Sequence, residues 1–251
     1  MDLGLNKRTA LVLGASKGIG KEICISLAME GCTIISVSRN KELLAELNKE
    51  LNRINNKNNF YYSFDLMDKG LINFISDIKL NHDISIIINN VGGSLVSRNY
   101  LGSSKEWIDA LVYNAGIAID VNSLFLSEFI KKKDGRICHV SSISAEMLRG
   151  NPLYASAKAY LNAYVKTVGR AVAKEGVILN AVMPGAVSFE GSYWDEIMKT
   201  NPIKVNDFLS HHQAVNRFGK PKEIASVVTF LVSDLASFMH GSIVPVDGGN
   251  M

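Results

Sequence analysis

A tyrosine and a lysine four residues apart, Tyr154 and Lys158, follow a proline in the stretch NPLYASAKAY. Pro152 suits the first turn of a helix, and positions i and i+4 share one helix face, so the phenol and the ammonium should be neighbours. A nearby cation can lower the pKa of a phenol, ordinarily about 10, and prepare it for proton transfer near neutral pH. A lone motif of this kind more often marks two surface side chains, so the rest of the chain has to decide.

Short apolar runs alternate with helical patterns along the whole chain. The runs predict strands at 9–14, 33–38, 60–64, 84–89, 136–141, 177–183 and 242–246. They are continuous, as expected of strands that helices cover on both faces. Helical patterns lie between them, for example GKEICISLAMEG, KELLAELNKELN and PKEIASVVTFLVSDLA. We therefore expect an α/β fold: a Rossmann-type, doubly wound parallel sheet of about seven strands with helices on both faces, in a single domain over residues 1–251.

A glycine-rich segment follows the first predicted strand and begins the first predicted helix. Gly14, Gly18 and Gly20 have the spacing GxxxGxG. Glycines allow a tight turn and a close approach of a diphosphate to the backbone, and a helix N-terminus offers free N–H groups. The pattern alone also fits an ordinary loop, but its place after a strand predicts nucleotide binding.

The end of the second predicted strand indicates which nucleotide. Ser38 and Arg39 stand where a site for NAD(H) usually has an acid for the ribose hydroxyls, and an arginine there can bind a 2′-phosphate instead. Lys17, inside the glycine loop, adds a second cation. Each could be an ordinary surface charge, but together they favour NADP(H).

Ser142 ends the fifth predicted strand, twelve residues before Tyr154. Carboxyl ends of such strands line the ligand crevice, so a hydroxyl there could hold a carbonyl oxygen while Tyr154 donates a proton. Further motifs agree in order: INNVGG at 88–93, KEWIDALVYNAG with Asn114, MPGAV at 183–187 and a terminal DGG. Over essentially its whole length the chain resembles the short-chain dehydrogenase/reductase family.

That resemblance implies four catalytic residues. Tyr154 would be the general acid in reduction and the base in oxidation, and Lys158 would lower its pKa and hydrogen-bond the nicotinamide ribose. Ser142 would polarise the substrate carbonyl, and Asn114 would hold a water that relays protons to Lys158. Asn122 competes for the role of Asn114, but Trp107, seven residues before Asn114, has the family's usual spacing.

The resemblance also implies a cofactor site. Asp65 and Leu66 would contact the adenine, Asn90 and Gly92 would flank the ribose, and residues 184–187 would meet the nicotinamide. The implied cofactor-binding set is Gly14, Ser16, Lys17, Gly18, Ile19, Gly20, Ser38, Arg39, Asp65, Leu66, Asn90, Gly92, Tyr154, Lys158, Pro184, Gly185 and Val187. Leu13 and Val91 depart from the family's usual Thr and Ala, which we interpret as packing changes.

The substrate is less well indicated. Compact relatives are most often 3-oxoacyl-thioester reductases, but Glu175 stands where those acting on an acyl-carrier protein often have Arg; Lys132 and Lys133 keep positive charge nearby. A polar ketone or sugar is the alternative, and a non-catalytic NADP(H) sensor a weaker one. We expect a substrate lid at about 186–217, rich in aromatic residues that mostly pack the lid onto the body of the protein. The pair His211 and His212 lacks a third ligand, so we expect no metal.

Composition excludes several other classes. A net charge of +3 without a dense basic tract argues against nucleic-acid binding. Three cysteines without CxxC spacing predict reduced thiols. No apolar stretch approaches 18 residues, and no secretory leader pattern is present, so we expect a cytoplasmic protein without membrane contact. The resemblance further implies a homo-oligomer, a dimer or tetramer, paired through the helices that carry Asn114 and Tyr154.

Overall fold

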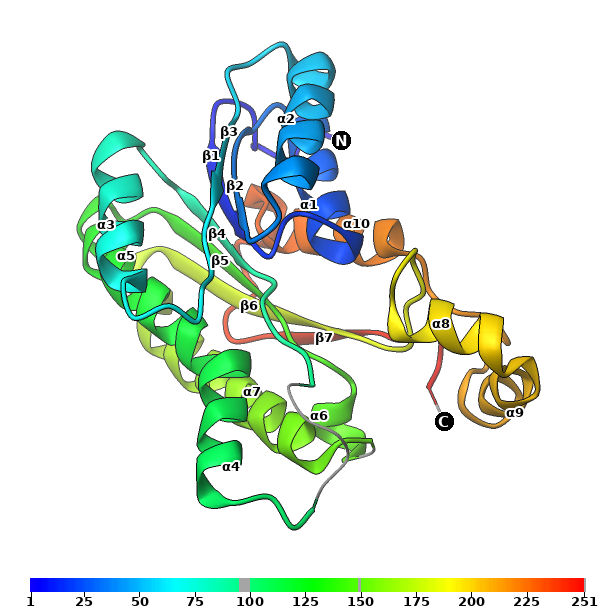
Figure 1. The fold of residues 1–251 in the computed structure, drawn as a ribbon. Helices are drawn as coiled ribbons and strands as arrows, with labels where there is room; N and C mark the ends of the chain where they lie inside the picture. The colour runs from blue at the N-terminus through cyan, green and yellow to red at the C-terminus, as the bar shows by residue number, and fades with distance from the viewer. Residues whose placement is uncertain (95–99, 149, 251) are drawn as a thin grey trace.

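One parallel sheet organises the protein, whose computed structural model describes residues 1–94, 100–148 and 150–250 (Figure 1). The strand order is β3-β2-β1-β4-β5-β6-β7, and every neighbouring pair is parallel. The strands are β1 (Thr9–Leu13), β2 (Thr33–Ser38), β3 (Phe60–Ser63), β4 (Ile86–Asn89), β5 (Gly135–Val140), β6 (Val177–Pro184) and β7 (Ile243–Val246). The predicted doubly wound sheet is confirmed.

Helices cover both faces of this sheet. One face packs on α1 (Gly18–Met29), α2 (Lys41–Asn55) and α10 (Pro221–Leu231), and the other on α3 (Leu71–Asn81), α5 (Ile117–Lys132) and α7 (Pro152–Val172) (Figure 1). The remaining helices are α4 (Ser104–Leu111), α6 (Ser144–Met147), α8 (Tyr193–Thr200) and α9 (Pro202–His212). A π-helical turn, η1 (Val112–Gly116), joins α4 to α5, and the short 3₁₀ turns are η2 (Ala173–Glu175) and η3 (Asp234–Ala236). Because each face has its own apolar cluster, the central strands are buried on both sides.

Local sequence explains most element boundaries. Asn151 caps α7 by accepting hydrogen bonds from the Leu153 and Tyr154 backbone, and Pro152 occupies the first helical position. The predicted helix over 221–236 is wrong at its end, where α10 stops at Leu231 and η3 follows. There Ser233 is fully buried, and its hydroxyl donates to the Phe230 carbonyl, which ends the helical ladder.

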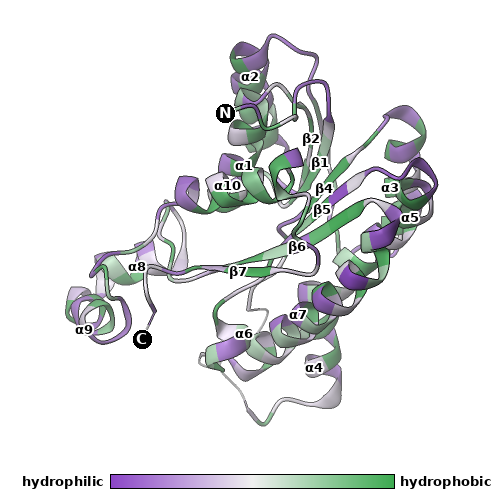
Figure 2. Ribbon diagram, turned by 180° about the vertical axis from the view of Figure 1, so that it is seen from behind, coloured by the Kyte–Doolittle hydropathy of each residue, from purple (hydrophilic) through white to green (hydrophobic). Residues whose placement is uncertain are grey.

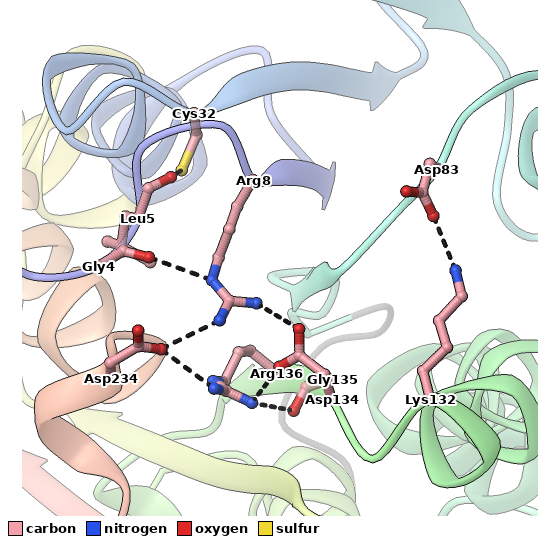
Figure 3. A network of polar contacts seen from close by, with 10 residues as sticks. All are labelled: Gly4, Leu5, Arg8, Cys32, Asp83, Lys132, Asp134, Gly135, Arg136 and Asp234. Atoms are coloured by element: carbon pink, nitrogen blue, oxygen red, sulfur yellow. Dashed lines mark hydrogen bonds and ion pairs between the residues drawn. The ribbon is translucent and has the colours of Figure 1, made fainter.

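Ion pairs between two arginines and two aspartates connect segments at the amino ends of the strands (Figure 3). Arg8 donates to Asp134 and Asp234 at 2.9 and 3.0 Å, and Arg136 pairs with the same two carboxylates at 2.7 and 3.1 Å. The network joins the segment before β1, the turn before β5 and η3. The network therefore lies at the amino ends of the strands. The predicted site residues gather at the opposite, carboxyl ends.

The segment Ser104–Lys132 would be long and apolar enough to cross a membrane by length and composition alone. It comprises α4, the π-turn and α5, and it packs against α3 and α7. Figure 2 shows hydrophilic and hydrophobic residues mixed along this segment. Because helices that cover a sheet share these properties, the segment is weak evidence for a membrane span.

Candidate active site

A cleft of about 590 Å³ lies at the carboxyl ends of the strands. It lies where the strand order reverses between β1 and β4, which is where ligands bind in sheets of this kind. The predicted site residues that line it are Gly14, Ser16, Lys17, Ile19, Ser38, Arg39, Asp65, Leu66, Asn90, Gly92, Ser142, Tyr154, Lys158, Pro184, Gly185 and Val187. The structure thus brings together groups that the chain spaces over more than 170 residues.

Tyr154, Lys158 and Ser142 meet at one point of the cleft. The Lys158 ammonium donates to the Val140 carbonyl at 2.9 Å and lies 5.9 Å from the centre of the Tyr154 ring. The Ser142 hydroxyl hydrogen-bonds the Tyr154 hydroxyl and accepts from the Ser144 backbone at 3.1 Å. Helix α7 therefore supplies the phenol and the ammonium, and the end of β5 supplies the hydroxyl.

The protonation of this pair differs from the sequence-based expectation. Burial raises the pKa of Tyr154, and the hydrogen bond with Ser142 offsets only part of that rise. Burial also lowers the pKa of Lys158 to about 7, so the ammonium is only partly charged at neutral pH. The protein groups alone therefore do not produce the lowered Tyr154 pKa that a fixed cation would give. They keep Tyr154 protonated, as a proton donor requires, beside a lysine that can gain or lose a proton near pH 7.

Asn114 lies behind the cleft and does not line it. Its Oδ1 accepts from Gly93 N at 2.8 Å, and its Nδ2 donates to the carbonyls of Gly93 and Ala110 at 3.0 and 2.9 Å. Both amide N–H donors are thus used, and only Oδ1 retains capacity for the water expected from the family resemblance. The residue lies in the π-turn, where Ile117 N reaches back to Val112 O, an arrangement frequent at functional sites.

Gly92 separates Asn114 from Lys158. A methyl group on its α-carbon would lie 2.6 Å from Asn114 Oδ1 and 2.8 Å from Lys158 Nζ. Its φ of +150° also disfavours other residues. The glycine therefore allows the amide and the ammonium to approach the same stretch of backbone.

The glycine loop forms a tight cradle after β1. Gly14 has φ +73°, and its carbonyl accepts from Asn90 Nδ2 at 2.9 Å, which fixes the loop to the end of β4. Gly20 lies beneath it, where a side chain would collide with the Gly14 carbonyl. Gly18 has φ +55° and is covered by the Phe189 ring, 2.5 Å from where its side chain would begin. Gly18 and Gly20 thus shape the loop without lining the cleft.

The groups expected to select the nucleotide remain open to a ligand. The Ser38 hydroxyl is buried at the cleft and has no hydrogen-bond partner among the described residues. Lys17 and Arg39 are exposed at the cleft, and neither forms a salt bridge with any part of the chain that the structure describes. An unpaired buried hydroxyl beside two unpaired cations fits a phosphorylated ribose.

Several lining residues escaped the sequence prediction. They are Asn40, Leu43, Phe64, Val91, Tyr113, Val140, Ser141, Phe189 and Trp194. Phe64 directly precedes Asp65 and stacks on Phe74 at 4.0 Å, and Leu43 lies in the first turn of α2, which Asn40 caps. Their adjacency to predicted residues was the available signal. Tyr113 directly precedes the predicted Asn114, but its direction toward Gly93 depends on the π-turn, which the sequence does not indicate.

The predicted packing of the lid aromatics onto the body is wrong for most of them, because Tyr193, Trp194 and Phe208 pack on one another or on Phe218, whereas Phe189 covers a body residue, Gly18. Trp194 lies 5.2 Å from Tyr193, 4.2 Å from Phe208 and 4.9 Å from Phe218, measured between ring centres. Phe189 and Trp194 also reach the cleft. Among the described residues no three His, Cys, Asp or Glu side chains gather as a metal site would require.

Comparison with known proteins agrees with this geometry. Residues 14–250 match the family model described as enoyl-(acyl carrier protein) reductase. The chain is 31% identical over 252 residues to the 3-oxoacyl-(acyl-carrier-protein) reductase of Buchnera aphidicola subsp. Schizaphis graminum, and 32% identical over 261 residues to that of Vibrio harveyi, with 98% of each chain covered in both cases.

A solved structure has the same fold. L-sorbose reductase from Gluconobacter frateurii, complexed with NADPH and L-sorbose, superimposes with a TM-score of 0.91 at 25% identity and covers 99% of this chain and 98% of its own. The fold, the ordered motifs and these full-length matches lead to one conclusion: the chain belongs to the short-chain dehydrogenase/reductase family.

Proposed function

We propose that the protein is an NADP(H)-dependent oxidoreductase that interconverts a carbonyl and a secondary alcohol. The convergence of Ser142, Tyr154 and Lys158 at the end of a cleft with a glycine cradle carries this proposal. Lys17, Ser38 and Arg39 would hold the 2′-phosphate of the cofactor, and the glycine loop its diphosphate. The cofactor, when bound, supplies or accepts the hydride.

The chain's own residues bind, orient and protonate the substrate. Ser142 hydrogen-bonds the carbonyl oxygen, and Tyr154, protonated because burial raises its pKa, donates a proton to the same oxygen. Lys158, with a pKa of about 7, can then pass a proton to the Tyr154 oxygen. Fixed positions for these groups supply much of the rate, because little rearrangement is needed during reaction.

A 3-oxoacyl thioester is the first candidate substrate, supported by the names of the two bacterial relatives. The charge pattern for an acyl carrier is mixed. Glu175 stands where an arginine would attract the acidic carrier. Lys132 is paired with Asp83 at 2.8 Å (Figure 3) and with Glu128 at 2.7 Å. However, Lys166 and Arg170 are exposed on α7, and Lys174 is exposed in the η2 turn that follows it.

A polar ketone or sugar is the second candidate. The reductase from Gluconobacter frateurii, whose structure contains L-sorbose, supports it. So does the presence of Trp194 and Phe189 at the cleft, because flat rings can cover a compact ligand. A non-catalytic NADP(H) sensor is disfavoured, since the tyrosine, lysine and serine are all in place.

We infer a substrate lid at about 186–217 for the same reaction. Hydrogen bonds from Ala214 and Val215 to the carbonyls of Gly249 and Gly248 hold one end, and a bridge between Val187 and Gly219 holds its base. Helices α8 and α9 between them extend beyond β6 (Figure 1). We also propose a cytoplasmic homo-oligomer, a dimer or tetramer, that binds neither nucleic acid nor membrane. Exposed Ile108, Val112 and Tyr160 on α4, the π-turn and α7 support such pairing.

The test is consumption of NADPH against a panel of carbonyl compounds. Acetoacetyl thioesters would be assayed beside diketones, keto sugars and cyclic ketones, with NADH in parallel. Turnover of the thioesters supports the first candidate, and turnover of a polar ketone alone supports the second. Tight NADPH binding with no turnover of any carbonyl would contradict the proposed reaction.

A further inference from the structure

Three buried polar side chains and one half-buried tyrosine lie together within the apolar layer near Lys158. They are Asn89 at the end of β4, Asn122 on α5, His139 on β5 and Tyr164 on α7. Asn89 Nδ2 donates to Asn122 Oδ1 at 3.0 Å, and Asn122 Nδ2 contacts both His139 Nε2 at 3.1 Å and the Tyr164 hydroxyl at 3.2 Å. We call these four residues the amide–imidazole cluster. Apolar residues surround these side chains, so burying them costs free energy unless they form hydrogen bonds.

The hydrogen bonds define the form of His139. An amide nitrogen only donates, so Nε2 must accept from Asn122 and the proton must lie on Nδ1. Burial lowers the pKa of His139 to about 3, so the ring stays neutral. Nδ1–H has no acceptor and Asn89 Oδ1 has no donor among the described residues. Asn89 and His139 are partners in the β4–β5 register, so this donor and this acceptor lie on neighbouring strands.

The cluster links the elements that carry the predicted catalytic groups. His139 immediately precedes Val140, whose carbonyl accepts from the Lys158 ammonium at 2.9 Å. Helix α5 continues the turn that holds Asn114, β5 leads to Ser142, and α7 carries Tyr154 and Lys158. We propose that His139 is a positioning residue for Lys158, acting through the amide–imidazole cluster and the Val140 carbonyl. This inference rests on the proposed function of Lys158.

The cluster also gives Lys158 polar surroundings that do not change with pH. The ionisable side chains facing this region are His139 from β5, Tyr154 and Tyr164 from α7, and Tyr113 from the π-turn; β4 contributes only amides. Burial keeps the pKa of Tyr154 and of Tyr164 raised, and His139 is neutral, so none of these three gains charge near pH 7. Replacing the imidazole by a hydrocarbon would make the region less able to stabilise an ammonium.

The experiment compares His139→Phe, His139→Gln and Cys138→Val. Cys138 is a matched control, because it is equally buried on the same strand but faces the opposite apolar cluster. The Lys158 pKa would be measured in each full-length, cofactor-free protein by NMR titration of ¹³Cε-labelled lysine, with Lys158→Met to assign the signal. Turnover would be followed against pH in parallel.

We expect His139→Phe to lower the Lys158 pKa by about one unit from about 7, which at neutral pH reduces the protonated fraction about fivefold. The kcat at pH 7 should fall about fivefold with an unchanged KM for the carbonyl. His139→Gln should keep the Lys158 pKa and the kcat near their native values. The glutamine amide can accept a hydrogen bond from Asn122 and can donate one as the imidazole Nδ1–H does. Cys138→Val should leave the Lys158 pKa within a few tenths of a unit.

An unchanged Lys158 pKa in His139→Phe, or an equal change in Cys138→Val, would overturn the inference. Tyr164→Phe removes a single hydroxyl from the cluster, and it should shift the Lys158 pKa in the same direction by a smaller amount. It keeps the test decisive if His139→Phe fails to fold, since no shift would then refute the cluster's role. The titration needs no substrate, so a failure to find any turnover counts against the proposed function and not against this inference.

Discussion

The substitution Gly92→Ala tests the geometry around Lys158 directly. Its added methyl group would lie 2.6 Å from Asn114 Oδ1 and 2.8 Å from Lys158 Nζ. Asn114 cannot give way easily, because three hydrogen bonds to Gly93 and Ala110 hold its amide. We therefore expect the flexible end of Lys158 to move and to lose the Val140 carbonyl. A hydrogen bond from a charged group contributes about 1.5–3 kcal/mol, so kcat should fall roughly ten- to hundredfold.

Gly93→Ala is the matched control for this change. Gly93 has φ +155°, close to the +150° of Gly92, so both substitutions impose similar backbone strain of about 1–3 kcal/mol. The methyl group on Gly93, however, would meet no described residue except Tyr113, at 3.8 Å. The difference between the two variants therefore isolates the displacement of Lys158 from the strain.

The assay is steady-state NADPH oxidation with the best carbonyl substrate, beside fluorescence titration of NADPH and thermal unfolding of both variants. We expect similar loss of stability in the two proteins but a much lower kcat in Gly92→Ala. Equal rates in Gly92→Ala and Gly93→Ala would refute the reasoning, because the predicted clash would then have no effect on the reacting groups.

Four other outcomes follow from the same site. Tyr154→Phe should abolish turnover and leave NADPH binding largely intact in a fluorescence titration; substantial residual activity would argue against Tyr154 as the acid. Arg39→Ala should raise the Kd for NADPH about tenfold more than for NADH, because one exposed charge-assisted hydrogen bond to the 2′-phosphate is lost; equal weakening would contradict that role. Burial lowers the Lys158 pKa to about 7 from about 10.4 in the unfolded chain, so the unfolded chain binds more protons between these values. The free energy of unfolding of the cofactor-free protein, measured with urea, should therefore rise from about pH 7 to about pH 10 relative to Lys158→Met; parallel curves would exclude this titration. A chelator should leave turnover unchanged, and strong inhibition would indicate a metal at His211 and His212.

The sheet was predictable because its signals are local. Each strand is a continuous apolar run, and Pro152 with Asn151 marks the start of α7, which places Tyr154 and Lys158 on one face. The end of α10 was not predictable, because the pattern VSDLA continues the helical period. Only tertiary burial of Ser233 shows that its hydroxyl ends the helix there.

The site was predictable as a set of positions but not as a set of interactions. Strand ends and glycines brought Gly14, Ser38 and Ser142 to one cleft, as the order of elements requires. The partners of Asn114 depend on a π-turn, which has no simple sequence period. The lowered Lys158 pKa depends on burial by distant segments, which a sequence motif does not contain.

The π-turn also holds an extra residue without changing the rotational phase of the helix after it. Ile117 N reaches back five residues to Val112 O, so deleting one residue from 112–116 would leave a continuous α-helix in which α4 and α5 keep their relative rotation. Asn122 would then keep its contact with His139, while Asn114 would lose the bulge that directs it to Gly93. A one-residue deletion there should therefore remove the contacts of Asn114 and leave the fold intact, whereas the same deletion within α5 should disturb the packing of the whole helix.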